Sequence, residues 1–160
     1  MLLGVISDTH GHVRNSLDAI QRLQTARVNL IVHCGDIGSP QIVELFSDWT
    51  THFVLGNVDH DTRELQAAIA AAGHIFHDRF GTLDIEGKRI AFLHGDDSRR
   101  WHETVNHGNY DLVCYGHTHK AELRKLNTTL LLNPGAVFRA NPRSVAVVDL
   151  PNLTVEFLNW

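Results

Sequence analysis

Six short apolar segments of the chain end alike, with an acidic, amide or imidazole side chain next to a glycine. Their carboxyl ends read ISDTHG, VHCGD, VLGN, FLHGD, CYGHTH and LLNPG. An aspartate or asparagine after a strand is often only a turn residue, and glycine permits the sharp turn needed there. Six consecutive endings of this kind favour another interpretation, in which the loops at one edge of a sheet converge on a common site.

The side chains at these ends form a set of seven oxygen and nitrogen donors without a thiolate. They are Asp8, His10, Asp36, Asn57, His94, His117 and His119. Because one ion takes roughly four to six such ligands, seven donors favour two ions. We expect Asp36 to bridge them, since a carboxylate has two oxygens. The mixture suits two divalent transition-metal ions, with Mn expected first and Fe, Ni, Co or Zn as alternatives.

This donor set predicts a particular chemistry. The alternation of His117 and His119 places both imidazoles on one side of an extended segment. A binuclear centre, with ions roughly 3.5–4 Å apart, activates a water molecule and holds the oxygens of an in-line displacement at phosphorus. We therefore predict metal-assisted hydrolysis of phosphate esters, in which Asp36 and Asn57 belong to the catalytic centre.

The elements that must position these side chains can be read from the apolar pattern. Strands are predicted at Leu2–Ile6, Val28–Val32, His52–Leu55, Arg89–Leu93, Asp111–Tyr115, Thr129–Leu132, Ser144–Val148 and Leu153–Leu158. Helices are predicted at Val13–Arg27 and after the caps Ser39, Asp61 and Ser98, and a hairpin at Glu86–Lys88. Strands and helices alternate first and strands dominate later, which predicts an α/β fold with mixed sheets in a single domain, residues 1–160.

Composition narrows the function classes. The 160 residues carry a net charge of −4, which gives no basic footprint for broad nucleic-acid binding. There is neither a signal-peptide pattern nor an apolar run long enough to cross a membrane, so we expect a cytoplasmic protein with no membrane partner. Cys34 and Cys114 lie in apolar runs and are expected to be reduced core thiols. Composition leaves both a monomer and a homodimer open.

The motifs resemble a known family. D-x-H at Asp8–His10, GD at 35–36, GN at 56–57, HG at 94–95 and GHTH at 116–119 are similar to the five signature blocks of calcineurin-like metallophosphoesterases. The short chain and the phrase SDTHG look most like the small YfcE-type phosphodiesterase branch, which also includes a retromer subunit with a degenerate site. The resemblance implies a four-layer α/β/β/α sandwich of two mixed β-sheets flanked by helices.

The resemblance also implies the role of each donor. One ion would be held by Asp8, His10, Asp36 and His119, and the other by Asp36, Asn57, His94 and His117. The substrate would be a small phosphate ester, most simply a phosphodiester. Two alternatives remain open: a non-catalytic interaction scaffold like the retromer subunit, and a phosphomonoesterase or protein phosphatase.

The third block departs from the family pattern. Many members carry a histidine where this chain has Val58, and that histidine protonates the leaving oxygen. An aliphatic side chain cannot do so, and general acid catalysis typically contributes about 10²–10⁴-fold. We therefore expect a substrate with a good leaving group. His12 and His60 are candidate replacements, although both also fit capping or surface roles, and Asp59 is expected to brace the loop.

The remaining polar candidates have simpler interpretations. His33 is expected to be a hydrogen-bonded core residue, and Arg139 is a candidate for neutralising a substrate phosphate. Asn133 is expected to form a structural turn near the cleft. Five further histidines fit none of the blocks and are expected on the surface or in helices: His52, His74, His77, His102 and His107.

Overall fold

The computed structural model describes residues 1–160 and contains eleven strands and four helices. The strands are β1 (Leu2–Ile6), β2 (Leu30–Cys34), β3 (Thr51–Val54), β4 (Ile75–Phe76), β5 (Phe80–Ile85), β6 (Lys88–Leu93), β7 (Leu112–Cys114), β8 (Ala121–Leu126), β9 (Thr129–Pro134), β10 (Ser144–Asp149) and β11 (Thr154–Asn159). The helices are α1 (Val13–Thr25), α2 (Pro40–Glu44), α3 (Thr62–Ala71) and α4 (Ser98–His107). None of the helices is long and apolar enough to cross a membrane.

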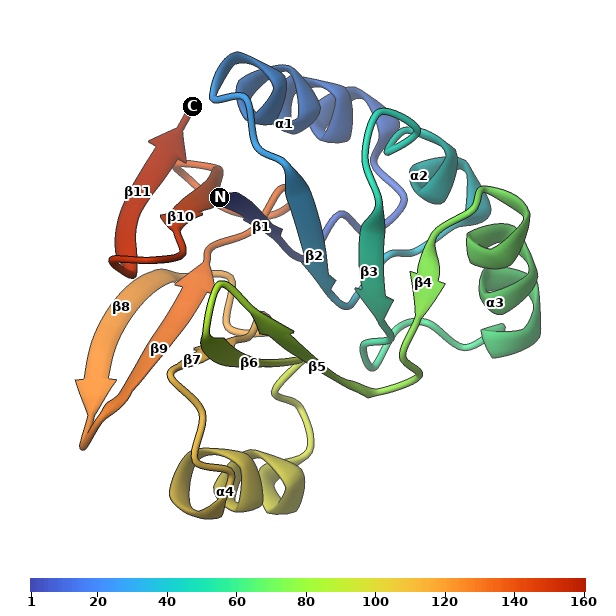
Figure 1. The fold of residues 1–160 in the computed structure, drawn as a ribbon. Helices are drawn as coiled ribbons and strands as arrows, with labels where there is room; N and C mark the ends of the chain where they lie inside the picture. Colours follow the sequence, from blue (N-terminus) through green and yellow to red (C-terminus); the bar gives the residue numbers. More distant parts are fainter.

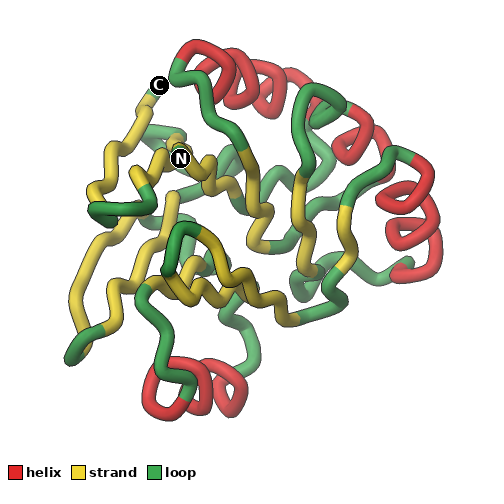
Figure 2. The backbone as a smooth tube through the Cα atoms, viewed as in Figure 1, coloured by secondary structure: helices red, strands yellow, loops and turns green.

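The strands form two mixed sheets with helices on both outer faces (Figures 1 and 2). The first sheet has the order β11-β10-β1-β2-β3-β4, and the second has the order β5-β6-β7-β9-β8. Helices α1, α2 and α3 cover the first sheet, and α4 lies against the second (Figure 1). This arrangement confirms the predicted four-layer α/β/β/α sandwich.

Three apolar clusters fill the spaces between the four layers. Residues such as Leu23, Phe46 and Ile69 pack between the first sheet and its helices. A second cluster, to which Leu3 and Val5 belong, joins the two sheets, and a smaller one lies between the second sheet and α4. Each fully buried aliphatic or aromatic side chain contributes roughly 1.5–3 kcal/mol, so the sandwich holds its loops on a rigid base.

Each sheet contains three parallel strands that matter for function. β1, β2 and β3 run parallel in the first sheet, and β6, β7 and β9 run parallel in the second. These are the six strands whose carboxyl ends carry the polar motifs. Parallel strands end at the same edge, so each sheet delivers three of the six loops to one side of the sandwich.

Some predicted boundaries are wrong. β2 begins at Leu30 rather than Val28, and α4 is capped by Asp97, whose carboxylate accepts the N–H groups of Arg99 and Arg100, rather than by Ser98. Strand β8 was not predicted, because its sequence AELRKL is charged and largely exposed at a sheet edge. The Asp61 cap is confirmed, since its side chain accepts the Glu64 N–H.

The placement of two histidines also differs from the prediction. His52 and His74 are buried rather than exposed. His52 Nδ1 lies 2.8 Å from His77 Nε2, and both rings pack edge-on against Phe92. His74 packs against Phe53. The sequence does not predict this burial, because a histidine in or beside a strand can direct its ring to the core or to the solvent.

His33 is the hydrogen-bonded core histidine that was predicted. Its Nε2 lies 3.0 Å from Thr9 Oγ1, its ring stacks on Phe53, and burial lowers its pKa from 6.5 to about 3. The unfolded chain therefore binds a proton at this residue between these pH values and the folded chain does not. The contribution of the neutral His33 to the free energy of unfolding is complete above pH 6.5 and is lost as the pH falls toward 3.

We expect the melting temperature to fall between pH 7 and pH 4.5, and the fall to be smaller in His33→Gln. Glutamine removes the titrating group while retaining a polar side chain of similar reach. Thermal unfolding followed by circular dichroism at several pH values measures both slopes. An identical pH dependence in the two proteins would show that His33 does not contribute to acid sensitivity.

Candidate functional site

The loops that carry the donors have an unusual backbone conformation. Asp8, His10, Asp36, His117 and His119 have positive φ angles of 57°, 48°, 54°, 69° and 58°. This region disfavours side chains other than glycine, and each such residue costs on the order of 1–3 kcal/mol where it is strained. Twelve non-glycine residues of the chain have a positive φ, and five of them are predicted donors that lie together, a clustering that is typical of functional sites.

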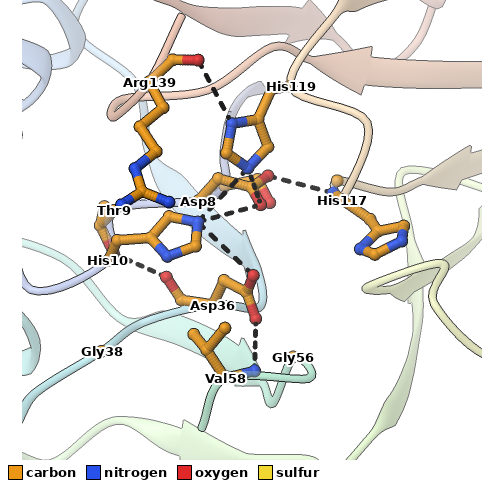
Figure 3. Close-up of polar contacts among 12 residues, drawn as sticks. Asp8, Thr9, His10, Asp36, Gly38, Gly56, Val58, His117, His119 and Arg139 are labelled. Carbon is orange, nitrogen blue, oxygen red and sulfur yellow. Dashed lines mark hydrogen bonds and ion pairs between the residues drawn. The ribbon is translucent and has the colours of Figure 1, made fainter.

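The first group of donors is formed by Asp8, His10 and His119 (Figure 3). His119 Nε2 lies 3.1 Å from Asp8 Oδ1 and 3.3 Å from His10 Nε2. Asp8 Oδ1 is buried, yet it has no hydrogen bond of acceptable geometry, although His119 Nε2 is close. The three ligand atoms lie within 4.8 Å of one another, close enough to bind a single cation.

The second group joins Asn57, His94 and His117. Asn57 Oδ1 lies 3.0 Å from His94 Nε2 and 3.1 Å from His117 Nδ1. The rings of the two histidines are 5.1 Å apart and nearly perpendicular, so both edges face the amide oxygen. All seven predicted donors are thus brought together by the folding of the two sheets.

Asp36 lies between the two groups. Its Oδ2 is 3.5 Å from His10 Nε2 and 3.2 Å from His94 Nε2, while its Oδ1 accepts the Val58 backbone N–H at 3.0 Å (Figure 3). Burial alone would raise the pKa of Asp36, but its hydrogen bond and charge interaction with His94, together with the Val58 N–H, lower the pKa below its usual value. The carboxylate is therefore ionised, and one oxygen faces both groups while the other is anchored to the backbone.

Further hydrogen bonds fix the imidazole rings. His94 Nδ1 donates to the Cys34 carbonyl at 2.8 Å, and His119 Nδ1 donates to the Arg139 carbonyl at 3.4 Å. Each carbonyl accepts the Nδ1 proton, which leaves Nε2 pointing toward the carboxylates. A carbonyl behind a histidine is the support that metal-binding imidazoles usually have.

Asp59 braces the loops, as predicted. Its buried carboxylate accepts N–H groups from Ile37 at 3.1 Å, Gly38 at 2.9 Å and Gly56 at 2.8 Å. Asp59 thereby ties the loop after β3 to the loop after β2. The N–H of its neighbour Val58 holds Asp36, so this short segment positions the central carboxylate through its backbone.

The structure separates the two candidate replacements for the missing acid. His12 caps α1, with Nδ1 accepting the Asn15 N–H, and its ring stacks on Phe138 at 5.0 Å. Phe138 also lies 5.8 Å from His10, so His12 is at the rim of the first group. His60 is exposed, and its side chain forms no hydrogen bond, ion pair or ring contact with the donors.

Two arginines stand near the donors. The exposed Arg139 places its guanidinium over Phe138, and Figure 3 shows its side chain extending toward His10. Arg79 was not singled out by the sequence, because it lies between β4 and β5 in no motif. Its Nη1 lies 3.4 Å from the Gly56 carbonyl, in the loop that carries Asn57, and only the folded structure reveals this contact.

Comparison with known proteins identifies the family. Residues 1–152 match the calcineurin-like phosphoesterase superfamily domain. The chain belongs to this superfamily. It is 33% identical, over 94% of its length and 86% of the other chain, to a probable metallophosphoesterase of Methanothermobacter thermautotrophicus. It is 28% identical, over 84% of its length and 83% of the other chain, to a phosphodiesterase of Methanocaldococcus jannaschii.

A solved structure supports the same relationship. An archaeal phosphodiesterase, 25% identical, superposes with a TM-score of 0.91 and covers all of both chains. Membership of this superfamily implies divalent metal ions. The buried Asp8 oxygen without a hydrogen bond, the Nε2 atoms that face the carboxylates and the ionised Asp36 fit a bound cation, because all of them face the space between the loops.

Proposed function

We propose that this protein is a metal-dependent phosphodiesterase that acts on small phosphate esters. One ion would be held by Asp8, His10, Asp36 and His119, and the other by Asp36, Asn57, His94 and His117. The observation that carries the proposal is the position of Asp36, whose Oδ2 lies within 3.5 Å of a histidine from each group. The phosphodiesterase relative supports the choice of reaction.

Two bound divalent ions would supply an activated water molecule and positive charge for the phosphoryl oxygens. The chain itself supplies the geometry. Asp36 stays ionised between the two groups, and the carbonyls of Cys34 and Arg139 keep His94 and His119 in one orientation. The side-chain oxygen of Asn57 faces His94 and His117. Its amide N–H₂ group therefore remains available to donate a hydrogen bond to a substrate oxygen.

The donor chemistry supports a transition metal. Four of the seven donors are imidazoles, which bind Mn, Fe, Co, Ni and Zn in preference to Mg. We infer Mn as the first choice because the three oxygen-donor side chains keep the site partly hard. Activity measured with each of these ions in turn ranks them.

The function is tested by the hydrolysis of bis(p-nitrophenyl) phosphate beside p-nitrophenyl phosphate, with metal-stripped protein and with protein reloaded with Mn²⁺, Ni²⁺ or Mg²⁺. We expect turnover only after reloading and a preference for the diester. The absence of turnover with every ion would contradict the proposal. A preference for the monoester would show that the protein is a phosphomonoesterase.

Val58 gives a separate prediction about the leaving group. Val58→His places an imidazole beside Asp36, where it can protonate a departing alkoxide, and general acid catalysis is typically worth about 10²–10⁴-fold. We expect a rate increase of about tenfold or more for an alkyl phosphodiester and little change for an aryl phosphodiester, whose leaving group needs no proton. The ratio of the two rates, measured in wild type and variant, is the readout. An unchanged ratio would mean that another group already protonates the leaving oxygen.

A non-catalytic scaffold is not favoured. A degenerate site would have lost donors or their supports, whereas here all seven donors, the strained backbone and the carbonyl acceptors behind the rings are present together. The five left-handed residues at the site lower the stability of the fold, and a bound ligand would offset that cost.

A further inference from the structure

A cavity lies directly beside His94, outside the donor groups. It has a volume of about 240 Å³ and is lined by His94, Asp96 and Asp97 together with Arg79 and Arg100. A second cavity of about 410 Å³ adjoins it, shares the two arginines, and extends along α4 to the aromatic side chains of Phe80 and Tyr110. The two cavities form one groove that starts at a donor of the second group, and the arginines stand where they meet.

Neither arginine of this groove has a close hydrogen-bond or ion-pair partner. Arg79 makes only long contacts, 3.4 Å to the Gly56 carbonyl and 3.9 Å to Asp96 Oδ2. Arg100 makes no side-chain hydrogen bond and no ion pair, although it is only partly exposed. A guanidinium without a strong partner is a ready site for a phosphate group, which it can bind through two parallel N–H bonds.

Four carboxylates also line the groove, namely Asp78, Asp96, Asp97 and Glu103, so its overall charge is not positive. Asp97 accepts the backbone N–H groups of Arg99 and Arg100, so one oxygen is committed to capping α4. Glu103 pairs with Arg99 at 3.0 Å. Asp96 faces Arg79 only at 3.9 Å, a distance at which an incoming anion can take its place. An anionic ligand would therefore be bound by the two guanidinium groups themselves and not by the charge of the groove as a whole.

We propose that Arg79 and Arg100 form a subsite for a second phosphate of the substrate, and that the substrate class is a nucleotide-type phosphodiester carrying an additional phosphate group. The inference rests on the proposed function, because it assumes that the scissile phosphate lies at the donors near His94 and that the rest of the substrate extends into the groove. Phe80 and Tyr110 would supply the aromatic wall for the nucleoside part in the larger cavity.

A matched pair of substrates tests the subsite. The p-nitrophenyl ester of thymidine 5′-phosphate is compared with the same ester bearing an added 3′-phosphate, using Mn²⁺-loaded protein. Because a hydrogen bond to a charged group discriminates strongly, we expect kcat/KM to be about tenfold or more higher for the substrate with the added phosphate, mainly through KM. We expect Arg100→Gln and Arg79→Gln each to reduce this ratio toward one.

The control is Arg63→Gln in α3, on the opposite outer face of the sandwich (Figure 1). Arg63 is exposed, lines neither cavity and forms no ion pair with a carboxylate of the groove, so the ratio should stay as in the wild type. Arg100→Gln is the more informative variant, since Arg79 also contacts the Gly56 loop and its loss could disturb Asn57. Equal rates for the two substrates in the wild type, or an unchanged ratio in Arg100→Gln, would overturn the proposal.

A binding measurement separates this inference from the proposed function. Titration of the same protein with thymidine 3′,5′-bisphosphate, followed by calorimetry, requires no turnover. Binding that is weakened about tenfold in Arg100→Gln but not in Arg63→Gln supports the subsite even if neither ester is hydrolysed, a result that would contradict only the enzymatic proposal. Binding that is equal in all variants would overturn the subsite while leaving the phosphodiesterase activity to its own test.

Discussion

Replacing Asp36 with asparagine is expected to reduce kcat/KM for an aryl phosphodiester by about 10³-fold or more. The ionised Asp36 oxygen lies between the two donor groups and faces a histidine of each. Metal ions contribute several kcal/mol to such reactions, and about 4 kcal/mol corresponds to roughly 10³ in rate. Asparagine keeps the size of the side chain and an acceptor for the Val58 N–H, so the change removes charge rather than packing.

The control for this variant is Asp84→Asn, at a carboxylate that is 82% exposed and pairs only loosely with Arg89. We expect it to keep wild-type activity and melting temperature. Steady-state kinetics with bis(p-nitrophenyl) phosphate under Mn²⁺ gives the comparison, and circular dichroism verifies folding. Near wild-type kcat/KM in Asp36→Asn would mean that Asp36 does not connect the two groups.

Gly56→Ala is expected to abolish activity although it changes no donor. A Cβ at this position would lie 2.1 Å from Asp36 Oδ1 and 2.4 Å from the Asp36 backbone nitrogen. Neither atom can retreat easily, because the Asp59 carboxylate and the Val58 N–H hold this segment in place. Overpacking of this kind costs typically about 1–3 kcal/mol, so we expect a lower melting temperature together with a displaced Asp36.

Gly73→Ala provides the matched control. Gly73 also has a positive φ, of 75°, so alanine is strained there, but its Cβ would meet nothing within 4 Å. We expect a modest loss of stability, about 1 kcal/mol, with activity retained. Urea denaturation and kinetics on both variants separate the two effects. Retained activity in Gly56→Ala would show that the loop yields without moving Asp36.

The site was more predictable than the elements around it. The convergence of the seven side chains could be inferred because glycine and a ligand-type side chain recur at six strand ends, and parallel strands must bring such ends together. The sequence could not predict which oxygen of Asp36 faces the histidines. Oδ1 accepts the Val58 backbone N–H, and this contact depends on the fold rather than on the side chain at position 58.

Strand β8 and the groove escaped prediction for related reasons. The charged sequence of β8 is compatible with a loop, and only its pairing with β9 makes it a strand. Arg79 and Arg100 are 21 positions apart and belong to no motif, so their meeting beside His94 depends on how the β4–β5 connection packs against α4. Long-range packing of exposed residues leaves no periodic signal in the sequence.

The most direct test of the central claim is a count of bound ions. Metal-stripped protein is equilibrated with Mn²⁺, freed of unbound ion, and measured by inductively coupled plasma mass spectrometry, beside His119→Ala and His94→Ala. We predict two ions per chain in the wild type and fewer in each variant, since each removes one donor from a different group. One ion or none in the wild type, or two ions in both variants, would contradict the binuclear site.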